Sequence, residues 1–254
     1  MRRRGSECAR NVTAATAAVV GLVVALGGCA AVGVRQGDAT VDFFPLVPNS
    51  NWEYAVSRRA GAERFLFMAT VRQDEFVPTN GRPCRIVDER YTDASEGQRF
   101  PIVYCSEGGF LHRVMSLEYR GEALQDNGLH SGELRFLPRD LRGTPSWEGR
   151  TNAYRLSDGS GFDVQQLHQV IPEAEPVQVP AGAFAQCLRV DTTAVHSAIG
   201  VDGAPVGPRF VFYYSDWYAP NVGLVRTEQR DVRGETLATI ELIRYEIGGE
   251  TAAR

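Results

Sequence analysis

The side chains of this chain that could carry acid–base or metal chemistry are widely spaced in the sequence. The four histidines show neither the i, i+2 spacing of a strand site nor an H-E-x-x-H motif, so they predict no zinc site. These histidines are His112, His130, His168 and His196. Catalytic carboxylate pairs come from distant strands, and Asp88, Glu89 and Asp216 are candidates for such a pair. Solvated strand faces explain these three acids equally well.

Other nucleophile and cofactor motifs are missing from the sequence. All 27 basic residues are arginine, which excludes a Walker A loop, a Schiff-base lysine and an S-x-x-K nucleophile pair. The serine between glycines in "SDGSGF" (157–162) lies in a stretch typical of a hairpin turn, not of a nucleophile elbow. The sequence therefore predicts no catalytic residue, no metal site and no cofactor.

Three cysteines, Cys84, Cys105 and Cys187, lie beyond the N-terminal region. Cys84 and Cys105 belong to two candidate strands joined by the polar segment 92–98, so a hairpin could bring them within disulfide distance. We predict this disulfide, which would close a loop of about 20 residues and stabilise the fold by about 3 kcal/mol. Cys187 is then expected to be a buried free thiol.

The segment "FVFYYSDWY" is the densest aromatic cluster of the chain, with six aromatic residues in nine. Strand alternation puts Trp217 on one face of this segment. The opposite face is expected to carry Phe210, Phe212, Tyr214 and Asp216. One interpretation is a strand that is buried on both faces. The other is an apolar concave surface for an acyl chain or a hydrophobic partner segment, with Phe210, Phe212, Tyr214 and Trp217 as candidate binding residues.

The N-terminal region has the features of a secretory signal peptide. Residues 2–10 contain four arginines, and a stretch rich in Ala, Val and Leu follows from Val12 to Leu26. The alternative is a membrane-spanning helix, which needs about 20 apolar residues and would have to include Gly27, Gly28 and the alanines beyond.

The tetrapeptide Leu26-Gly27-Gly28-Cys29 resembles the lipobox of bacterial lipoproteins. This resemblance implies that residues 1–28 are cleaved off, that Cys29 receives diacylglycerol on its thiol, and that its new amino group is acylated, typically with palmitate. The diacylglycerol and the acylated amino group together supply three acyl chains, which are enough to anchor a protein stably in a membrane. The residue after Cys29 is alanine and not aspartate, which in the family's sorting pattern implies the outer membrane, facing the periplasm.

The charge of the chain argues against a nucleic-acid partner. The net charge is −4, and removing residues 1–28, which carry four arginines and one glutamate, would take it to −7. A protein that binds nucleic acid needs a basic face to neutralise phosphates. The expected partners are therefore the membrane, through the lipid on Cys29, and a lipid or an envelope protein.

The rest of the sequence predicts an all-β, mainly antiparallel fold with few or no long helices. Short runs rich in Val, Ile, Phe and Tyr alternate with polar residues and end at Gly, Pro, Asn or Asp. We expect a lipidated flexible tether over 29–42, a β-rich domain over 43–247 and a disordered tail over 248–254. The sheet is expected to be strongly curved or a half-barrel.

An internal similarity suggests that this domain contains two β-meander repeats, 43–134 and 135–247. "FFPLVPNSNWEY" resembles "RFLPRDLRGTPSWEG", and "CRIVDERY" resembles "CLRVDTTA", with the order of the matches kept along the chain. Two such repeats would join into one curved sheet, because two copies are too few to stack as a solenoid. Chance similarity among strand-rich stretches is the alternative.

Three stretches resemble a known group of bacterial lipoproteins. The opening "FFPLVPNSNWEY", the middle "VPAGAFAQCLRV" and the closing "WYAPNVGLVRTE" are similar to uncharacterised lipoproteins of the TapB-like type. The resemblance covers most of residues 43–247 and implies an antiparallel sheet, curved as in the half-barrels of the LolA/LolB kind. Each motif is a turn or a strand, so the resemblance implies location and fold and no activity.

We therefore expect a membrane-anchored cell-envelope lipoprotein that acts as a non-enzymatic binding or assembly module. Two alternatives remain: an envelope hydrolase with carboxylates at the mouth of the sheet, and a purely structural envelope component. An acid-lined cleft would favour the hydrolase, an apolar groove beside Trp217 would favour binding, and the lack of any groove would favour the structural role.

Overall fold

The structure, a computed structural model, describes residues 41–59, 64–76, 81–91, 98–125 and 129–248, which all belong to one compact unit, Thr40–Arg254. Every regular element within these ranges is a β-strand. The strands are β1 (Asn51–Arg58), β2 (Arg64–Phe76), β3 (Cys84–Tyr91), β4 (Gln98–Glu107), β5 (Phe110–Ser116), β6 (Tyr119–Arg120), β7 (Ala123–Leu124), β8 (Leu129–Ser131), β9 (Leu134–Pro138), β10 (Ser146–Arg155), β11 (Gly161–Val179), β12 (Gly182–Ile199), β13 (Pro205–Ala219), β14 (Gly223–Arg230) and β15 (Thr236–Glu246).

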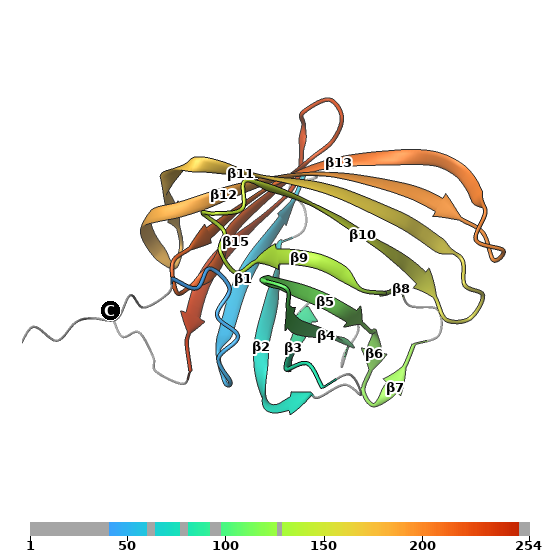
Figure 1. Ribbon diagram of the computed structural model, residues 1–254, viewed down its shortest axis with the longest axis horizontal. Coiled ribbons are helices and arrows are strands. Elements are labelled where there is room, and N and C mark those ends of the chain that lie inside the picture. Colours follow the sequence, from blue (N-terminus) through green and yellow to red (C-terminus); the bar gives the residue numbers. More distant parts are fainter. Residues whose placement is uncertain (1–40, 60–63, 77–80, 92–97, 126–128, 249–254) are drawn as a thin grey trace, which may run out of the picture. The chain divides into compact units, whose positions relative to one another are not determined.

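All the strands belong to one 15-stranded antiparallel sheet that closes on itself (Figure 1). Going round the ring, the order is β4-β3-β2-β1-β15-β14-β13-β12-β11-β10-β8-β5, and β5 pairs back onto β4. The prediction of an all-β, strongly curved antiparallel sheet is confirmed. The curvature goes further than a half-barrel, because β1 pairs with β15 and β5 pairs with both β4 and β8.

Alternation of apolar and polar residues explains why the strands bury one face. In β1, the side chains of Trp52, Tyr54 and Val56 are buried, while the residues between them are only half-buried. Burying an apolar side chain of this size contributes roughly 1.5–3 kcal/mol, so each strand is held in register with this face inward. The core of the ring consists of such residues.

The chain winds as two meanders, β1–β5 and β10–β15, in which consecutive strands are neighbours in the sheet. This arrangement suits the two predicted repeats, and the repeat itself stays a prediction. The predicted signal peptide, Cys29 and the tether up to residue 40 lie outside the described residues, as do residues 249–254 of the predicted tail. No helix within the described ranges is long and apolar enough to span a membrane.

Three strands of the second meander are much longer than the others. β11, β12 and β13 have 19, 18 and 15 residues, and their hairpins extend beyond the rest of the ring in Figure 1. The pairing of β11 with β12 is interrupted by register shifts between Ile171 and Val177, which bend the hairpin. Its turn is fastened to the sheet where the Ala181 N–H donates to the Leu242 carbonyl over 3.0 Å.

A short segment before β1 closes one end of the ring. The Asp42 N–H donates to the Asn221 side-chain carbonyl over 3.1 Å, and the Asn221 N–H donates back to the Asp42 carbonyl over 2.7 Å. The Phe44 ring then enters the ring of strands and packs against Tyr104 and Phe136, with centroid distances of 5.3 and 5.2 Å. We call residues 42–49 the cap. The opposite end of the ring is the one at which β1 ends and β2 begins.

Candidate functional site

The interior of the ring contains a chamber of about 240 Å³ behind the cap. Most of its wall is aromatic or aliphatic, and its polar side chains are a glutamate, an aspartate, an arginine and three tyrosines. The lining residues are Phe44, Trp52, Tyr54, Phe67, Ala69, Val87, Glu89, Ile102, Tyr104, Arg113, Phe136, Asp216, Tyr218 and Leu224. They come from the cap and from eight strands, so the chamber exists only when the ring is closed.

A second space of about 470 Å³, which we call the vestibule, adjoins the chamber on the side away from the cap. The two spaces share Glu89, Ile102 and Arg113 in their walls. The remaining vestibule residues are Arg58, Phe65, Tyr91, Gln98, Phe100 and Ser116. They lie at the strand ends opposite the cap, so the vestibule lies between those strand ends and the chamber.

Glu89 stands at the junction of the chamber and the vestibule. In β3 it alternates with Val87 and Tyr91, which also line these spaces, so its half-buried side chain faces the interior. Burial raises the pKa of Glu89 to about 7, and the positive charge of Arg113 opposes this shift. The carboxyl group is therefore close to half-protonated at neutral pH and carries no fixed charge there.

Asp216 is the second carboxyl group of the chamber and comes from β13. The Thr227 hydroxyl donates to its Oδ1 over 2.7 Å. Burial raises the pKa of Asp216 to about 6; this hydrogen bond opposes the shift, and the charge of Asp191 adds to it. Asp216 is thus ionised at neutral pH and becomes neutral in mild acid.

Three tyrosines form the polar part of the chamber wall between these acids. The Tyr54 hydroxyl donates to the Leu224 carbonyl over 3.0 Å. Burial raises the pKa of Tyr54, Tyr104 and Tyr218 above the ordinary value, and nearby Glu89 or Asp216 adds to the shift. The three phenols stay protonated and offer hydroxyl groups without adding charge.

The structure brings together two of the three acids that the sequence marks as candidates. Glu89 and Asp216 line the same chamber, whereas Asp88 faces the other side of β3, where its carboxylate lies 4.0 Å from the guanidinium of Arg99. The positive charge of Arg113 opposes the shift in the pKa of Glu89, and the charge of Asp191 adds to the shift in the pKa of Asp216.

The candidate aromatic residues of β13 divide between two environments. Phe210, Phe212 and Tyr214 follow one another on the face that also carries Asp216, with Phe210 45% exposed and the other two half-buried. Trp217 lies on the opposite face and is buried, with its indole N–H donating to Glu175 over 3.1 Å. The structure therefore does not gather the four residues on one apolar surface, and the chamber is not beside Trp217.

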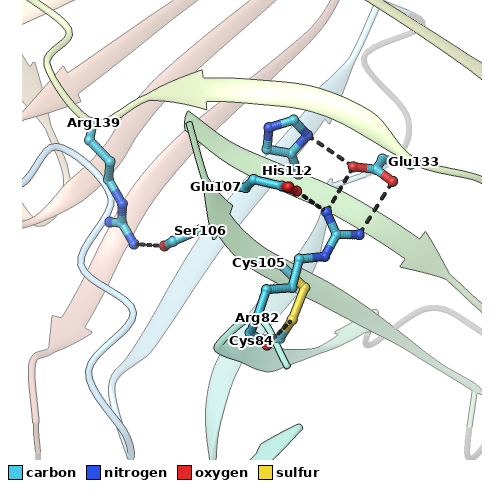
Figure 2. The surroundings of a disulfide bond; sticks show 8 residues. All are labelled: Arg82, Cys84, Cys105, Ser106, Glu107, His112, Glu133 and Arg139. Atoms are coloured by element: carbon cyan, nitrogen blue, oxygen red, sulfur yellow. Dashed lines mark hydrogen bonds and ion pairs between the residues drawn. A yellow bond between two sulfur atoms is a disulfide. The ribbon is translucent and has the colours of Figure 1, made fainter. Parts of the chain in front are cut away.

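Cys84 and Cys105 stand directly opposite each other in the pairing of β3 with β4 and are joined by a disulfide (Figure 2). Cys187 is the free cysteine among the described residues and is fully buried. Burial raises the pKa of its thiol to about 11, and the charge of Glu175 adds to the shift, so Cys187 stays protonated and unreactive at neutral pH.

A polar cluster lies beside the disulfide (Figure 2). The Arg82 guanidinium donates to both carboxylate oxygens of Glu133, over 3.1 and 3.3 Å, and also to Glu107. His112 Nδ1 lies 3.0 Å from the same Glu133 carboxylate. The hydrogen bond from Arg82 lowers the pKa of Glu133. The cluster joins β4 and β5 to the segments before β3 and β9, which is a structural role.

The remaining histidines serve the packing of the sheet. His168 stacks on Trp147 with a centroid distance of 4.5 Å, its Nδ1 is 2.8 Å from the Thr192 hydroxyl, and burial lowers its pKa to about 4. His130 is fully buried between the Gln125 carbonyl and the Glu118 N–H. The described part of the chain holds no group of three or more His, Cys, Asp or Glu side chains arranged for a metal ion.

Arg113 and the chamber tyrosines are site residues that sequence reasoning missed. Their signal is a polar side chain at an inward position of an alternating strand. Glu89 stands between Val87 and Tyr91 in β3, and Arg113 lies two residues after the buried Leu111 in β5, opposite Tyr104 of β4. Such positions normally carry apolar residues.

Comparison with known proteins identifies the fold. A DUF3108-like family model matches residues 158–242, from the turn before β11 into β15. A solved structure of a candidate lipoprotein from Parabacteroides distasonis is similar with a TM-score of 0.57 and 18% identity, covering 81% of this chain and 99% of that one. A candidate exported protein with a YmcC-like fold from Bacteroides fragilis gives 0.53 and 17%, with the same coverages. The chain shares their fold.

No curated protein matches the chain in sequence. The resemblance to the TapB-like type stays a prediction, because the family model that matches is the DUF3108-like one. Among the polar residues of the chamber, Asp216 and Tyr218 lie within the matched segment, whereas Glu89 and Arg113 lie outside it.

Proposed function

We propose that this chain is a lipid-anchored, non-enzymatic module of the cell envelope that binds an amphiphilic small molecule inside its closed sheet. The observation that carries the proposal is a change in the polarity of the lining residues. The vestibule is polar, Glu89 and Arg113 lie at its junction with the chamber, and the chamber is mostly apolar. Concave sites with apolar walls and a few convergent polar groups are typical of small-molecule sites.

The cap determines how such a ligand would lie. Because Phe44 blocks the far end, an apolar tail would enter from the vestibule and end in the chamber, with its polar head at the junction. The chamber, at about 240 Å³, is smaller than the roughly 300–1,000 Å³ of ordinary ligand pockets, and the vestibule, at about 470 Å³, falls within that range. A single slender chain suits these dimensions better than a bulky ring system.

The proposed location follows from the sequence. The lipobox-like motif ending at Cys29 supports a lipid anchor, and Ala30 after it supports the outer membrane, facing the periplasm. The two similar structures are described as a candidate lipoprotein and a candidate exported protein, which supports the cell envelope. Membership of the TapB-like type belongs to the same proposal.

A hydrolase is the second candidate, because Glu89 and Asp216 have raised pKa values of about 7 and about 6 in one chamber. Between these values one acid is protonated and the other ionised, as acid–base catalysis requires. We favour binding over hydrolysis because the wall of the chamber is mostly aromatic or aliphatic, as is typical of small-molecule sites.

The test places a larger side chain in the chamber and compares it with the same side chain on the other face of the strand. In the chain from Ala30 onward, which contains every described strand, Ala69→Phe adds a ring to the chamber wall, whereas Met68→Phe adds the same ring on the other face of β2, where Met68 is 38% exposed. Calorimetric titration with decanoate and decanol is expected to show binding by the wild type and by Met68→Phe, and a loss of at least about tenfold in Ala69→Phe.

Unfolding curves of the two variants provide the control for folding. If Ala69→Phe unfolds cooperatively and still binds the amphiphiles as the wild type does, the chamber is not their site. If the wild type binds neither decanoate nor decanol, the proposed function is wrong.

A further inference from the structure

Arg113 carries the permanent positive charge at the junction of the vestibule and the chamber, and it lacks a full set of acceptors. Its Nε is inaccessible to water, and among the residues that the structure describes no acceptor lies within hydrogen-bond distance of it. Arg113 contributes to the walls of both the vestibule and the chamber. Because arginine stays charged, an anionic group of a ligand in either space would lie close to a permanent positive charge.

Glu89 is the nearest candidate to neutralise Arg113, and its environment makes it a weak one. The two side chains share both spaces and attract each other, yet burial outweighs this attraction and raises the pKa of Glu89 to about 7. At neutral pH the carboxyl group is therefore close to half-protonated, whereas arginine stays charged. In its neutral form Glu89 is a hydrogen-bond donor beside the guanidinium.

Two other polar groups of the chamber already have partners within the chain. Asp216 accepts a hydrogen bond from the Thr227 hydroxyl over 2.7 Å, and the nearby charge that acts on Asp216 is that of Asp191. The Tyr54 hydroxyl is used by the Leu224 carbonyl. The junction thus presents the guanidinium of Arg113 and a carboxyl group of Glu89 that can donate a proton, and the Tyr104 hydroxyl lies near both, because Tyr104 stands opposite Arg113 in the pairing of β4 with β5. These donors together match an anionic oxygen pair.

We infer that the ligand of this site is a single-chain amphiphile with a carboxylate head, whose two oxygens accept hydrogen bonds from Arg113 and Glu89 while its tail fills the chamber. This inference rests on the proposed function and adds the charge and the type of the head group. A monoanion fits better than a phosphate monoester, because the junction offers one arginine and the acids nearby would repel a second negative charge.

The experiment compares heads of different charge on one tail. Decanoate, decanol and decylammonium are titrated into the chain from Ala30 onward at neutral pH. Decanoate is expected to bind about 10- to 100-fold more tightly than decanol, the ratio that a hydrogen bond to a charged group supplies. Decylammonium is expected to bind no better than decanol, because its charge is repelled by Arg113.

A pair of arginine variants assigns the preference to the junction. Arg113→Gln is expected to reduce the decanoate-to-decanol ratio to near one while decanol binding is kept. Arg90→Gln is the control, because Arg90 is exposed and follows Glu89 on the other face of β3; its ratio is expected to equal that of the wild type. Thermal unfolding of both variants shows whether the fold is kept.

The outcomes separate this inference from the proposed function. Equal binding of decanoate and decanol, with both lost in Ala69→Phe, would overturn the carboxylate head and leave the chamber as the binding site. If decylammonium bound most tightly of the three probes, the carboxylate head would also be overturned, and the carboxyl groups of Glu89 and Asp216 would be the groups that recognise the head. A preference for decanoate that survives in Arg113→Gln would show that another group recognises the carboxylate. Failure of all three probes to bind would overturn both.

Discussion

Each ionisable side chain in the chamber occupies a position where strand alternation normally places an apolar residue. Glu89, Arg113 and Asp216 all line the chamber, the rest of whose wall is mostly aromatic or aliphatic. Burying such groups lowers stability unless they are paired. Side chains that are costly to bury and unnecessary for packing are expected to serve the ligand, and their energetic cost can be measured.

Glu89→Gln is expected to stabilise the protein in alkaline buffer. The pKa of Glu89 rises from 4.5 to about 7 on folding, mainly through burial, so the folded state binds more protons than the unfolded state between these values. Stability therefore falls as pH rises from about 4.5 to 7, by up to about 3 kcal/mol in total. Glutamine has no such loss, so Glu89→Gln is expected to unfold at a higher temperature than the wild type at pH 8 and at a similar one near pH 4.5.

The control for this measurement is Asp88→Asn. Asp88 is the neighbouring carboxylate on the other face of β3, where Arg99 is near it, so its loss removes a favourable charge interaction and should give no gain at pH 8. If the unfolding temperatures of the wild type and Glu89→Gln differed by the same amount at pH 4.5 and at pH 8, this result would contradict the raised pKa of Glu89.

At the scale of strands, the disulfide fastens the hairpin of β3 and β4 at the end that carries the cap. Cys84 and Cys105 are 21 residues apart in sequence and directly opposite in register. The double variant Cys84→Ala/Cys105→Ala is expected to lose about 3 kcal/mol of unfolding free energy, as the loop-entropy estimate gives for a loop of this length. Urea unfolding with and without dithiothreitol measures the loss.

The reductant itself provides the control in that experiment. Dithiothreitol is expected to lower the urea midpoint of the wild type towards that of the double variant and to leave the double variant unchanged, because Cys187 is unpaired. Identical midpoints for the oxidised wild type and the double variant would show that the bridge does not stabilise the fold.

Local sequence patterns predict the strands of this sheet, and long-range pairing determines the rest. Alternation in stretches such as "NWEYAVSR" identifies β1, and a polar loop between two cysteine-bearing strands suffices to suggest their hairpin. Closure of the ring depends on β1 meeting β15 and on β5 meeting β8, and no local pattern encodes those pairings. For the same reason the sequence marks Glu89 and Asp216 only as two acids among many, and it gives no hint that Arg113 joins them.

At the scale of the whole unit, the cap and the vestibule lie at opposite ends of the ring. The described chain begins at the cap, where Asp42 and Asn221 are hydrogen-bonded, while the vestibule lies at the far strand ends, beside Arg58 and Ser116. We therefore predict that anchoring through Cys29 and binding in the chamber are separable properties of the protein.

Cys29→Ser tests this separation together with the anchor itself. The wild type, expressed in its own envelope or a related one, is expected to incorporate labelled palmitate and to sediment with membranes, because the lipobox-like motif directs acylation to the Cys29 thiol. Cys29→Ser has no thiol and is expected to lose the label, while the purified variant still binds decanoate as the chain from Ala30 onward does. Equal label in both proteins would disprove acylation at Cys29, and loss of decanoate binding in the variant would show that the anchor contributes to the site.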